Sequence, residues 1–295
     1  MSEERDWTRL AKKITIHAPG EKVWEALSNQ DDLQKWMGER VVLEPKVRGW
    51  FALWGRGTYG SAVPLETPGK VIAFDRLTRL GLQFIFKGFT VRQIITIDEA
   101  DPSTTVRVEY ELPENALPSH WYLAQDHAIL LLYNLRSYAE SGRSCVLPDA
   151  PSVERTVHLS ALIAAQASEV FAALTVPVIM DKWISAAAKV DLRPGGIYSF
   201  GWVETKPDGT LAPMGAARVI EVEPGVLLKH SWQHSMEAPT QVEWRVEQEG
   251  MLTKVSLSHS GFAAEDDYPG YVQGWAAFLC ILKALLEGKS KVEDA

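Results

Sequence analysis

Apolar and polar residues alternate with a period of two through several segments of the second half of the chain. Polar residues such as Lys229, Glu243 and Lys254 separate the apolar ones. Because successive side chains of a strand point to opposite faces, this pattern predicts antiparallel strands with one wet face and one buried face. The expected inner faces carry Tyr198, Phe200 and Trp202; Leu228, His230, Trp232 and His234; Val242, Trp244 and Val246; and Val255, Leu257 and His259.

A helical period follows the alternating segments. Apolar residues recur at three- and four-residue spacing from Tyr271 to Leu286, and Gly288 then provides a stop signal. A similar pattern runs over residues 119–142 in the first half. Each half is therefore expected to end in a long amphipathic helix.

The two halves also begin alike. Short strands are expected over residues 13–17 and 155–162, each followed by a helix, for which Ser168 is the expected cap in the second half. A second short helix carries Trp36 in one half and Trp183 in the other.

These similarities amount to an internal repeat with a spacing of 147 residues. Residues 23–27 (VWEAL) match residues 170–174 (VFAAL), and Lys35-Trp36 and Gly49 recur as Lys182-Trp183 and Gly196. Small residues and two prolines interrupt both periodicities near residue 150. We expect one domain over residues 8–145, a second over 153–290, and a linker over 146–152.

The order of elements predicts the fold class. A strand, two helices, a run of antiparallel strands and one long helix give an α+β domain with its helices on one side of the sheet. Such a layout leaves room for a cavity between the sheet and the long helix.

Several segments of the second half resemble a known family. They are residues 169–175 with Trp183, residues 193–200 (RPGGIYSF), residues 215–224, Ser231-Trp232, and residues 253–262 (TKVSLSHSGF) leading into Gly274-Trp275. Together they are similar to the domain of the heat-shock-protein-90 ATPase activator homologues, in the START-like, birch-pollen-allergen-like (SRPBCC) superfamily. The resemblance implies two tandem helix-grip domains, each a curved antiparallel sheet wrapped around a long C-terminal helix, with two short helices near its N-terminus.

The first half is a divergent copy. It has residues 110–113 (YELP) where the second has residues 259–262 (HSGF), and His127 at the position of Gly274. The superfamily includes lipid carriers, hormone receptors, ring cyclases and co-chaperone modules, so the resemblance specifies a fold more closely than a function.

Composition narrows the functional classes. The net charge is −8, and no block of consecutive Lys or Arg could follow a phosphate backbone, which argues against nucleic acid as a partner. The N-terminus is acidic, and the longest apolar run, residues 128–133, is too short to span a membrane, so we expect a cytoplasmic protein. The two cysteines, Cys145 and Cys280, form no CxxC pair, and no cofactor is expected.

Two motifs that could indicate a nucleotide or metal site have a simpler structural explanation. Residues 55–60 fit GxGxxG, but Pro64 and Pro68 follow where a dinucleotide site needs a helix, so a turn between strands is expected. His230 and His234 lie about 13 Å apart along one strand, too far to share a zinc ion. No GxSxG, HExxH or Cys/His arrangement indicates a catalytic nucleophile or metal.

An inward-facing aromatic set is the strongest indication of function. His259 is expected to point inward beside Trp275, either as a buried histidine satisfied by the protein or as a polar anchor for a ligand. The aromatic residues either line a pocket or simply fill the core. The candidate ligand-binding residues are Trp183, Tyr198, Phe200, Trp202, His230, Trp232, Trp244, His259, Phe262, Trp275 and Phe278.

Three functions follow as hypotheses. The first is a non-enzymatic protein that binds a small hydrophobic molecule in the second domain. The second is an activator-like co-chaperone or other protein-interaction module, and the third is a cyclase-like enzyme. In the first domain, Trp50 and Trp54 face away from the core and could contact the other copy or another subunit.

Overall fold

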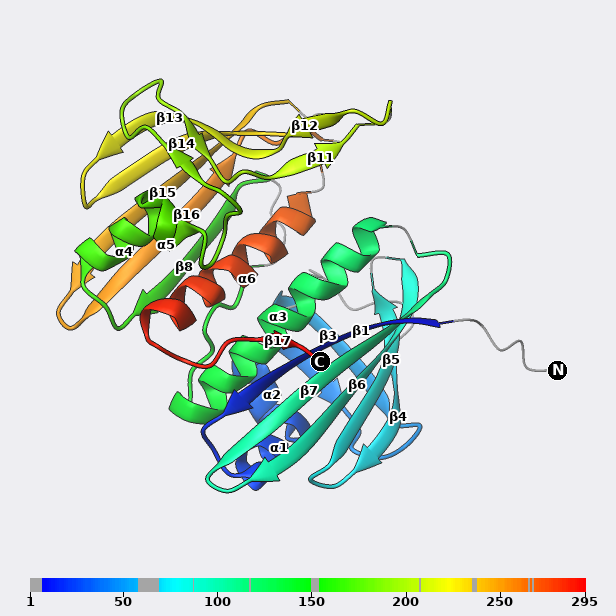
Figure 1. The fold of residues 1–295 in the computed structure, drawn as a ribbon. Coiled ribbons are helices and arrows are strands. Elements are labelled where there is room, and N and C mark those ends of the chain that lie inside the picture. The colour runs from blue at the N-terminus through cyan, green and yellow to red at the C-terminus, as the bar shows by residue number, and fades with distance from the viewer. Residues whose placement is uncertain are drawn as a thin grey trace. The chain divides into compact units, whose positions relative to one another are not determined.

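The computed structural model describes residues 7–57, 69–86, 88–116, 118–149, 154–206, 208–234, 238–264, 266 and 268–295 (Figure 1). The chain divides into two compact units, Met1–Pro151 with Ser290–Ala295, and Ser152–Lys289. The expected linker over residues 146–152 begins inside the first unit, because Val146 is buried and its amide donates to Asn134 Oδ1. Residues 150–152 of that linker lie outside the described residues. At the other end, residues 290–295 belong to the first unit because they pair with its sheet.

In its described residues, the first unit is an antiparallel sheet with three helices. Its eight strands lie in the order β17-β1-β7-β6-β5-β4-β3-β2. The strands are β1 (Trp7–Ile16), β2 (Gly38–Leu43), β3 (Trp50–Gly57), β4 (Gly69–Asp75), β5 (Arg79–Phe86), β6 (Phe89–Ala100), β7 (Ser103–Pro113) and β17 (Glu293–Asp294), and the helices are α1 (Gly20–Ser28), α2 (Gln30–Trp36) and α3 (Pro118–Ser141).

The second unit repeats this plan with a smaller main sheet, in the order β13-β14-β15-β16-β8. Two further pairs, β9 with β10 and β11 with β12, lie outside that sheet. The strands are β8 (Val157–Ile163), β9 (Lys189–Val190), β10 (Tyr198–Ser199), β11 (Val203–Thr205), β12 (Leu211–Pro213), β13 (Gly215–Glu223), β14 (Leu227–Gln233), β15 (Thr240–Glu249) and β16 (Leu252–Ser260), and the helices are α4 (Ala167–Thr175), α5 (Pro177–Met180) and α6 (Tyr268–Leu286).

Equivalent hydrogen bonds, like equivalent elements, recur within each of the two units. The indole of Trp36 donates to the Ala26 carbonyl at 2.8 Å, and that of Trp183 donates to the Ala173 carbonyl at 2.9 Å. The hydroxyl of Thr104 donates to Ala18, and that of Thr253 to Ala165, both at 2.7 Å. Because each bond satisfies a buried polar group, these contacts fix the helices on the sheet in the same way in both copies.

The repeated glycine, Gly49 before β3 and Gly196 before β10, has a steric cause. A Cβ on Gly196 would lie 2.1 Å from the Asp191 carbonyl oxygen, and one on Gly49 would lie 2.3 Å from that of Glu44. We expect Gly196→Ala to lower the free energy of unfolding by roughly 1–3 kcal/mol, because backbone atoms must move to admit the methyl group. Urea unfolding followed by circular dichroism measures this. Unchanged stability in Gly196→Ala would contradict the steric argument, because Gly196 has no positive φ that could add a separate backbone cost.

Two sequence-based predictions about local structure were wrong. Ser168 does not cap α4: the helix begins at Ala167, and its cap is Gln166, which exchanges hydrogen bonds with Glu169 in a capping box. The expected strand through Tyr198, Phe200 and Trp202 stops at Ser199. Gly201 has φ +75° and packs closely against the Ala186 carbonyl, so the chain turns away from an extended course there.

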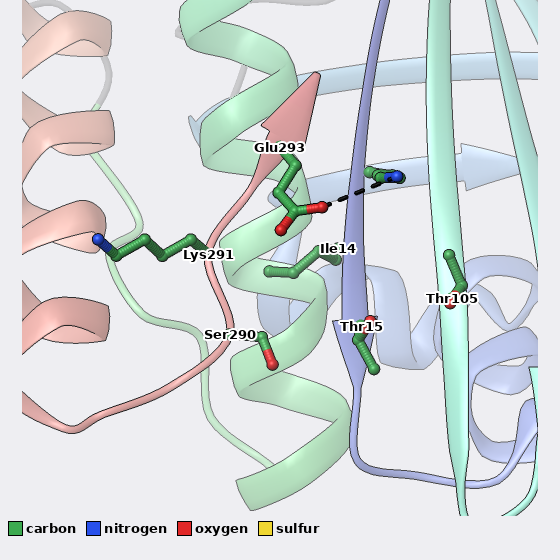
Figure 2. A pocket seen from close by; sticks show the side chains of 7 residues that line it. Ile14, Thr15, Thr105, Ser290, Lys291 and Glu293 are labelled. Carbon is green, nitrogen blue, oxygen red and sulfur yellow. Dashed lines mark ion pairs between the residues drawn. The ribbon is translucent and has the colours of Figure 1, made fainter. Parts of the chain in front are cut away.

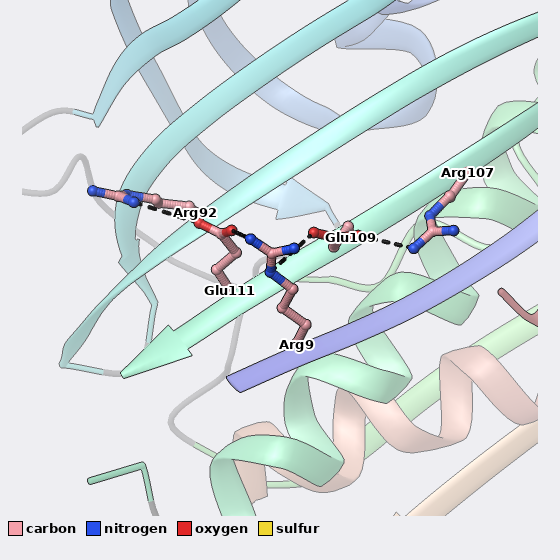
Figure 3. A network of polar contacts seen from close by, with 5 residues as sticks. All are labelled: Arg9, Arg92, Arg107, Glu109 and Glu111. Atoms are coloured by element: carbon pink, nitrogen blue, oxygen red, sulfur yellow. Dashed lines mark hydrogen bonds and ion pairs between the residues drawn. The ribbon is translucent and has the colours of Figure 1, made fainter. Parts of the chain in front are cut away.

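The outer face of the first unit's sheet is charged. Arg9 on β1 bridges Glu109 and Glu111 of β7, at 3.5 and 3.0 Å (Figure 3). Arg92 of β6 and Arg107 of β7 complete the network. Exposed ion pairs contribute about 0–1 kcal/mol each, so this network keeps the face solvated more than it stabilises the fold. Trp50, on the outer face of β3, is 49% exposed, and Trp54 is partly exposed.

The GxGxxG segment begins at the end of β3, where Gly55 and Gly57 both have positive φ. Residues 58–60 lie outside the described residues.

Candidate functional site

Aromatic side chains lie between the main sheet and α6 in the second unit. Helix α6 approaches β8 more closely than it approaches the other strands of that sheet. Over β14 and β15 the space is bridged by Trp232, Trp244 and Trp275, whose ring centroids lie 5.0 Å (Trp232–Trp275) and 5.6 Å (Trp244–Trp275) apart. All three are at most 6% exposed. The result is an interior of large rings in tilted and edge-on contact, a favourable arrangement for aromatic groups.

The sheet register shows why these residues face one another. His230 of β14, Val242 of β15 and His259 of β16 lie opposite one another in one row across the sheet. Leu228, Trp244 and Leu257 form the next row. Since positions two apart on a strand share a face, both rows point into the interior.

His259 is held by protein groups on both sides of its ring. The indole N–H of Trp275 donates to Nδ1 at 2.9 Å, and Nε2 lies 2.6 Å from the hydroxyl of Thr240. Because Nδ1 accepts, the proton is on Nε2 and is donated to Thr240. Burial lowers the pKa of His259 to about 3, with a smaller contribution from His230, so the ring is neutral.

His230 is different, because only one of its ring nitrogens has a protein partner. Nδ1 lies 3.1 Å from the Ser231 carbonyl oxygen, which can only accept, so the proton is on Nδ1. The lone pair of Nε2 therefore faces the interior, and it has no hydrogen-bond partner among the described residues. The side chain is fully buried against Tyr198 and Phe200, and burial lowers its pKa to about 4.

Trp244 supplies the complementary group. Its indole Nε1 is buried and has no acceptor among the described residues. Trp244 lies diagonally across from His230 on the neighbouring strand, a spacing of about 7–8 Å that long side chains can bridge. Among the described residues, an unpaired acceptor and an unpaired donor thus belong to residues on neighbouring strands of the same inner face.

All eleven sequence-predicted site residues lie on this interior or at its border. Trp183 contacts Trp244, Trp202 stacks on Phe278 at 5.5 Å, and Phe262 lies 4.4 Å from the His259 ring. His234, predicted to share the inner face of β14, lies just beyond the end of that strand and contacts Glu204 at 3.1 Å instead.

Two residues of the interior were missed by sequence reasoning. Thr240 continues the alternation of Val242 and Trp244 by one step, and Tyr271 lies one helical turn before Trp275. Both signals were present in the sequence. Tyr271 packs on Trp232 and His259, and its hydroxyl accepts from the Trp232 indole at 3.3 Å.

The first unit has a different polar interior at the same place. Leu82, Gln93 and Tyr110 occupy the row that His230, Val242 and His259 occupy in the second unit. The Gln93 amide donates to the Tyr110 hydroxyl, which is hydrogen-bonded to Nδ1 of His127 on α3. All three side chains are fully buried, and burial lowers the pKa of His127 to about 3.

Metal binding and membrane insertion find no further support in the described part of the chain. No group of three His, Cys, Asp or Glu residues within it could hold a metal ion. Helix α6 is long and apolar enough to cross a membrane by composition, with a hydropathy of 1.3. Its buried face carries the aromatic and aliphatic core of the second unit, which accounts for that composition.

Comparison with known proteins agrees with this architecture. Residues 164–287 match the family model described as Activator of Hsp90 ATPase homolog 1-like protein. No match was found among the curated proteins.

Similar solved structures include DynU16, a protein of the dynemicin biosynthetic locus, with 17% identity, 95% of this chain and 99% of that chain covered, and a TM-score of 0.39. CalU16 from Micromonospora echinospora has 24% identity, coverage of 45% and 75%, and a TM-score of 0.39. The Aha1 dimer from Colwellia psychrerythraea has 20% identity, coverage of 45% and 96%, and a TM-score of 0.38. The second unit, with its antiparallel sheet and long C-terminal helix, thus matches the Activator of Hsp90 ATPase homolog 1-like family model over residues 164–287.

Proposed function

We propose that the second unit binds a small, largely aromatic molecule between β14–β16 and α6, and that it does so without catalysis. The observation that carries the proposal is the pair of buried, unpaired nitrogens, His230 Nε2 and Trp244 Nε1. Leaving a buried polar atom unpaired costs about 1–3 kcal/mol, so most such atoms in folded proteins have partners. Two of them on one inner face, surrounded by aromatic rings, suit a ligand that supplies the missing bonds.

The two nitrogens specify the polar chemistry of that ligand. Nε2 of His230 accepts a hydrogen bond, and Nε1 of Trp244 donates one. A hydroxyl group satisfies both at once, because it donates its proton and accepts through its oxygen. We therefore expect a phenol or an alcohol on a flat apolar frame.

The surrounding residues have separate roles in this proposal. Trp232, Trp275, Tyr198 and Phe200 form the apolar walls. His259 serves to position Trp275, since both of its ring nitrogens already have protein partners. The remaining predicted residues form the border through ring contacts: Trp183 with Trp244, Trp202 with Phe200, Phe262 with His259 and Phe278 with Trp275.

Native mass spectrometry of the purified full chain tests the proposal. We expect a non-covalent adduct of a few hundred daltons in the native spectrum that is absent from the denatured one. His230→Leu should abolish the adduct, because it removes the acceptor. The matched control is His158→Leu, the same change at an exposed position of the same unit, which should leave the adduct in place.

A clean apo mass, with no adduct after incubation with simple phenols, would contradict ligand binding. The description of the matched family then supplies the alternative, a co-chaperone role. Stimulation of an Hsp90 ATPase by this chain, unaffected by His230→Leu, would favour that alternative.

A further inference from the structure

In the first unit, the edge of β1 that faces away from β7 pairs with a short segment from far along the sequence. We call Ser290–Ala295 the return segment. Within it, Glu293 and Asp294 form β17 and pair antiparallel with Lys13 and Lys12. The Ala295 amide donates to the Ala11 carbonyl at 3.3 Å. Lys12 Nζ lies 2.5 Å from Asp294, and Lys13 Nζ lies 3.7 Å from Glu293, so basic side chains of the edge face acidic side chains of the segment.

Helix α3 also binds the return segment, through two buried side chains. Arg136 is 3% exposed, its guanidinium lies 5.0 Å from the centre of the Tyr133 ring, and it donates to the Ser290 carbonyl. The Tyr133 hydroxyl accepts from the Val292 amide at 3.3 Å. Backbone groups of the return segment are thus bound by side chains of α3 as well as by the strand edge.

The second unit provides an internal comparison, because its β8 occupies the place of β1. The residue that corresponds to Arg136 is Lys283, which donates to the Leu162 carbonyl of β8 and pairs with Glu287, both at 2.5 Å. Cys280 stands in the place of Tyr133. The second unit therefore uses this helix position to cover its own edge, whereas the first unit uses it to hold another segment.

The return segment occupies only part of the available edge. Strand β1 pairs with β7 along all ten residues, but β17 pairs with only Lys12 and Lys13. Beyond them, Ile14 and Thr15 line a polar pocket of about 300 Å³ together with Thr105 and residues 290, 291 and 293 (Figure 2). The segment diverges from the strand here, and the structure describes no further strand along this part of the edge.

We propose that the β1 edge, with Arg136 and Tyr133, is a docking site for an extended peptide that carries consecutive acidic residues. The peptide adds to the sheet as a strand, and the return segment occupies the site in cis and competes with it. Strand addition at an open edge draws its affinity from backbone bonds and its specificity from side chains. Here the specificity comes from Lys12 and Lys13, and the short pairing of the return segment allows a longer acidic strand to displace it.

A fluorescently labelled peptide with the sequence of residues 289–295 (KSKVEDA) tests the site. Its affinity is measured by anisotropy against the wild-type full chain and against the double variant Glu293→Lys, Asp294→Lys. The double variant places like charges opposite Lys12 and Lys13 and so releases the return segment. We expect at least tenfold tighter binding to the double variant, because a covalently attached competitor acts at a high effective concentration.

Two further substitutions in the double variant locate the site. Arg136→Ala should weaken peptide binding at least tenfold, whereas the matched change in the second unit, Lys283→Ala, should alter it less than twofold. Equal binding to the wild type and the double variant, or an equal effect of both changes, would overturn the proposal. Hydrogen exchange gives an independent result: amides near residues 11–13 should lose protection in the double variant and regain it with peptide, and unchanged protection would also overturn it.

Discussion

Replacing His230 by leucine is expected to make the ligand-free protein more stable. The substitution removes a buried acceptor that has no partner among the described residues, which costs about 1–3 kcal/mol, and it forfeits one hydrogen bond to Ser231 worth about 1 kcal/mol. The first unit shows that leucine suits the position, since Leu82 occupies the same place there and is 1% exposed. We expect a net gain of up to about 2 kcal/mol in the free energy of unfolding, measured by urea titration after ligand has been removed.

The control for this experiment is again His158→Leu, which should change stability by less than about 0.5 kcal/mol because the side chain is exposed. A loss of stability in His230→Leu would mean that Nε2 is satisfied within the protein. In that case the polar argument for a ligand would fail, whatever the aromatic walls suggest.

A residue that is retained at a cost to stability is a common property of binding sites. In this chain, the equivalent rows of the two units can be compared directly. In the first unit, the equivalent row contains Leu82, Gln93 and Tyr110, and the polar members bond to each other and to His127. In the second unit, His259 is satisfied by Thr240 and Trp275, but His230 has one nitrogen without a partner among the described residues. The two copies therefore differ in the polar groups of this row of the sheet.

The fold was largely predictable from sequence, because its main signals are periodic. Alternation predicted the inner faces of β14, β15 and β16, and helical spacing predicted α3 and α6. The errors came from single backbone positions. Gly201 ends a strand through a left-handed φ, and Gln166 takes the capping role that Ser168 was expected to fill.

The return segment shows a second limit of sequence reasoning. Residues 291–295 (KVEDA) carry little apolar character and match nothing in the repeat. Their pairing with β1 depends on a strand almost the whole chain length away, and local patterns contain no information about such a partner. The charges of Lys12, Lys13, Glu293 and Asp294 become informative only once the strands are known to be neighbours.

The eleven candidate residues lie on one interior or at its border in the structure, and their binding of a ligand stays a prediction. The hydrogen bonds among them could not be predicted from the sequence. Which nitrogen of His230 or His259 is protonated depends on the atoms within about 3 Å of each ring, and these come from neighbouring strands and from α6. The sequence indicates His259 as the candidate polar anchor. Only the contacts of both rings favour His230 instead.

Acid is expected to destabilise the wild-type protein more than His230→Leu. Burial lowers the pKa of His230 from 6.5 to about 4, so between these values the unfolded chain binds a proton that the folded chain does not. Folding stability must then fall as the pH falls from about 6.5 towards 4, by up to about 1.4 kcal/mol per pH unit. The loss due to this histidine amounts to roughly 3 kcal/mol.

Comparing the variant with the wild type isolates this contribution from the other buried groups. His259 and His127, with pKa values lowered to about 3, add slopes of the same sign, and Asp126, whose pKa burial raises to about 7, adds one of the opposite sign. These three groups remain in both proteins, so their contributions to the free energy of unfolding largely cancel when the wild type and the variant are compared. Urea unfolding at pH 7, 6, 5 and 4.5 should therefore show a stability advantage of His230→Leu that widens steadily with acid, beyond its value at neutral pH. Parallel curves would mean that His230 titrates alike in the folded and unfolded chain, which a fully buried neutral imidazole with an unpaired nitrogen does not permit.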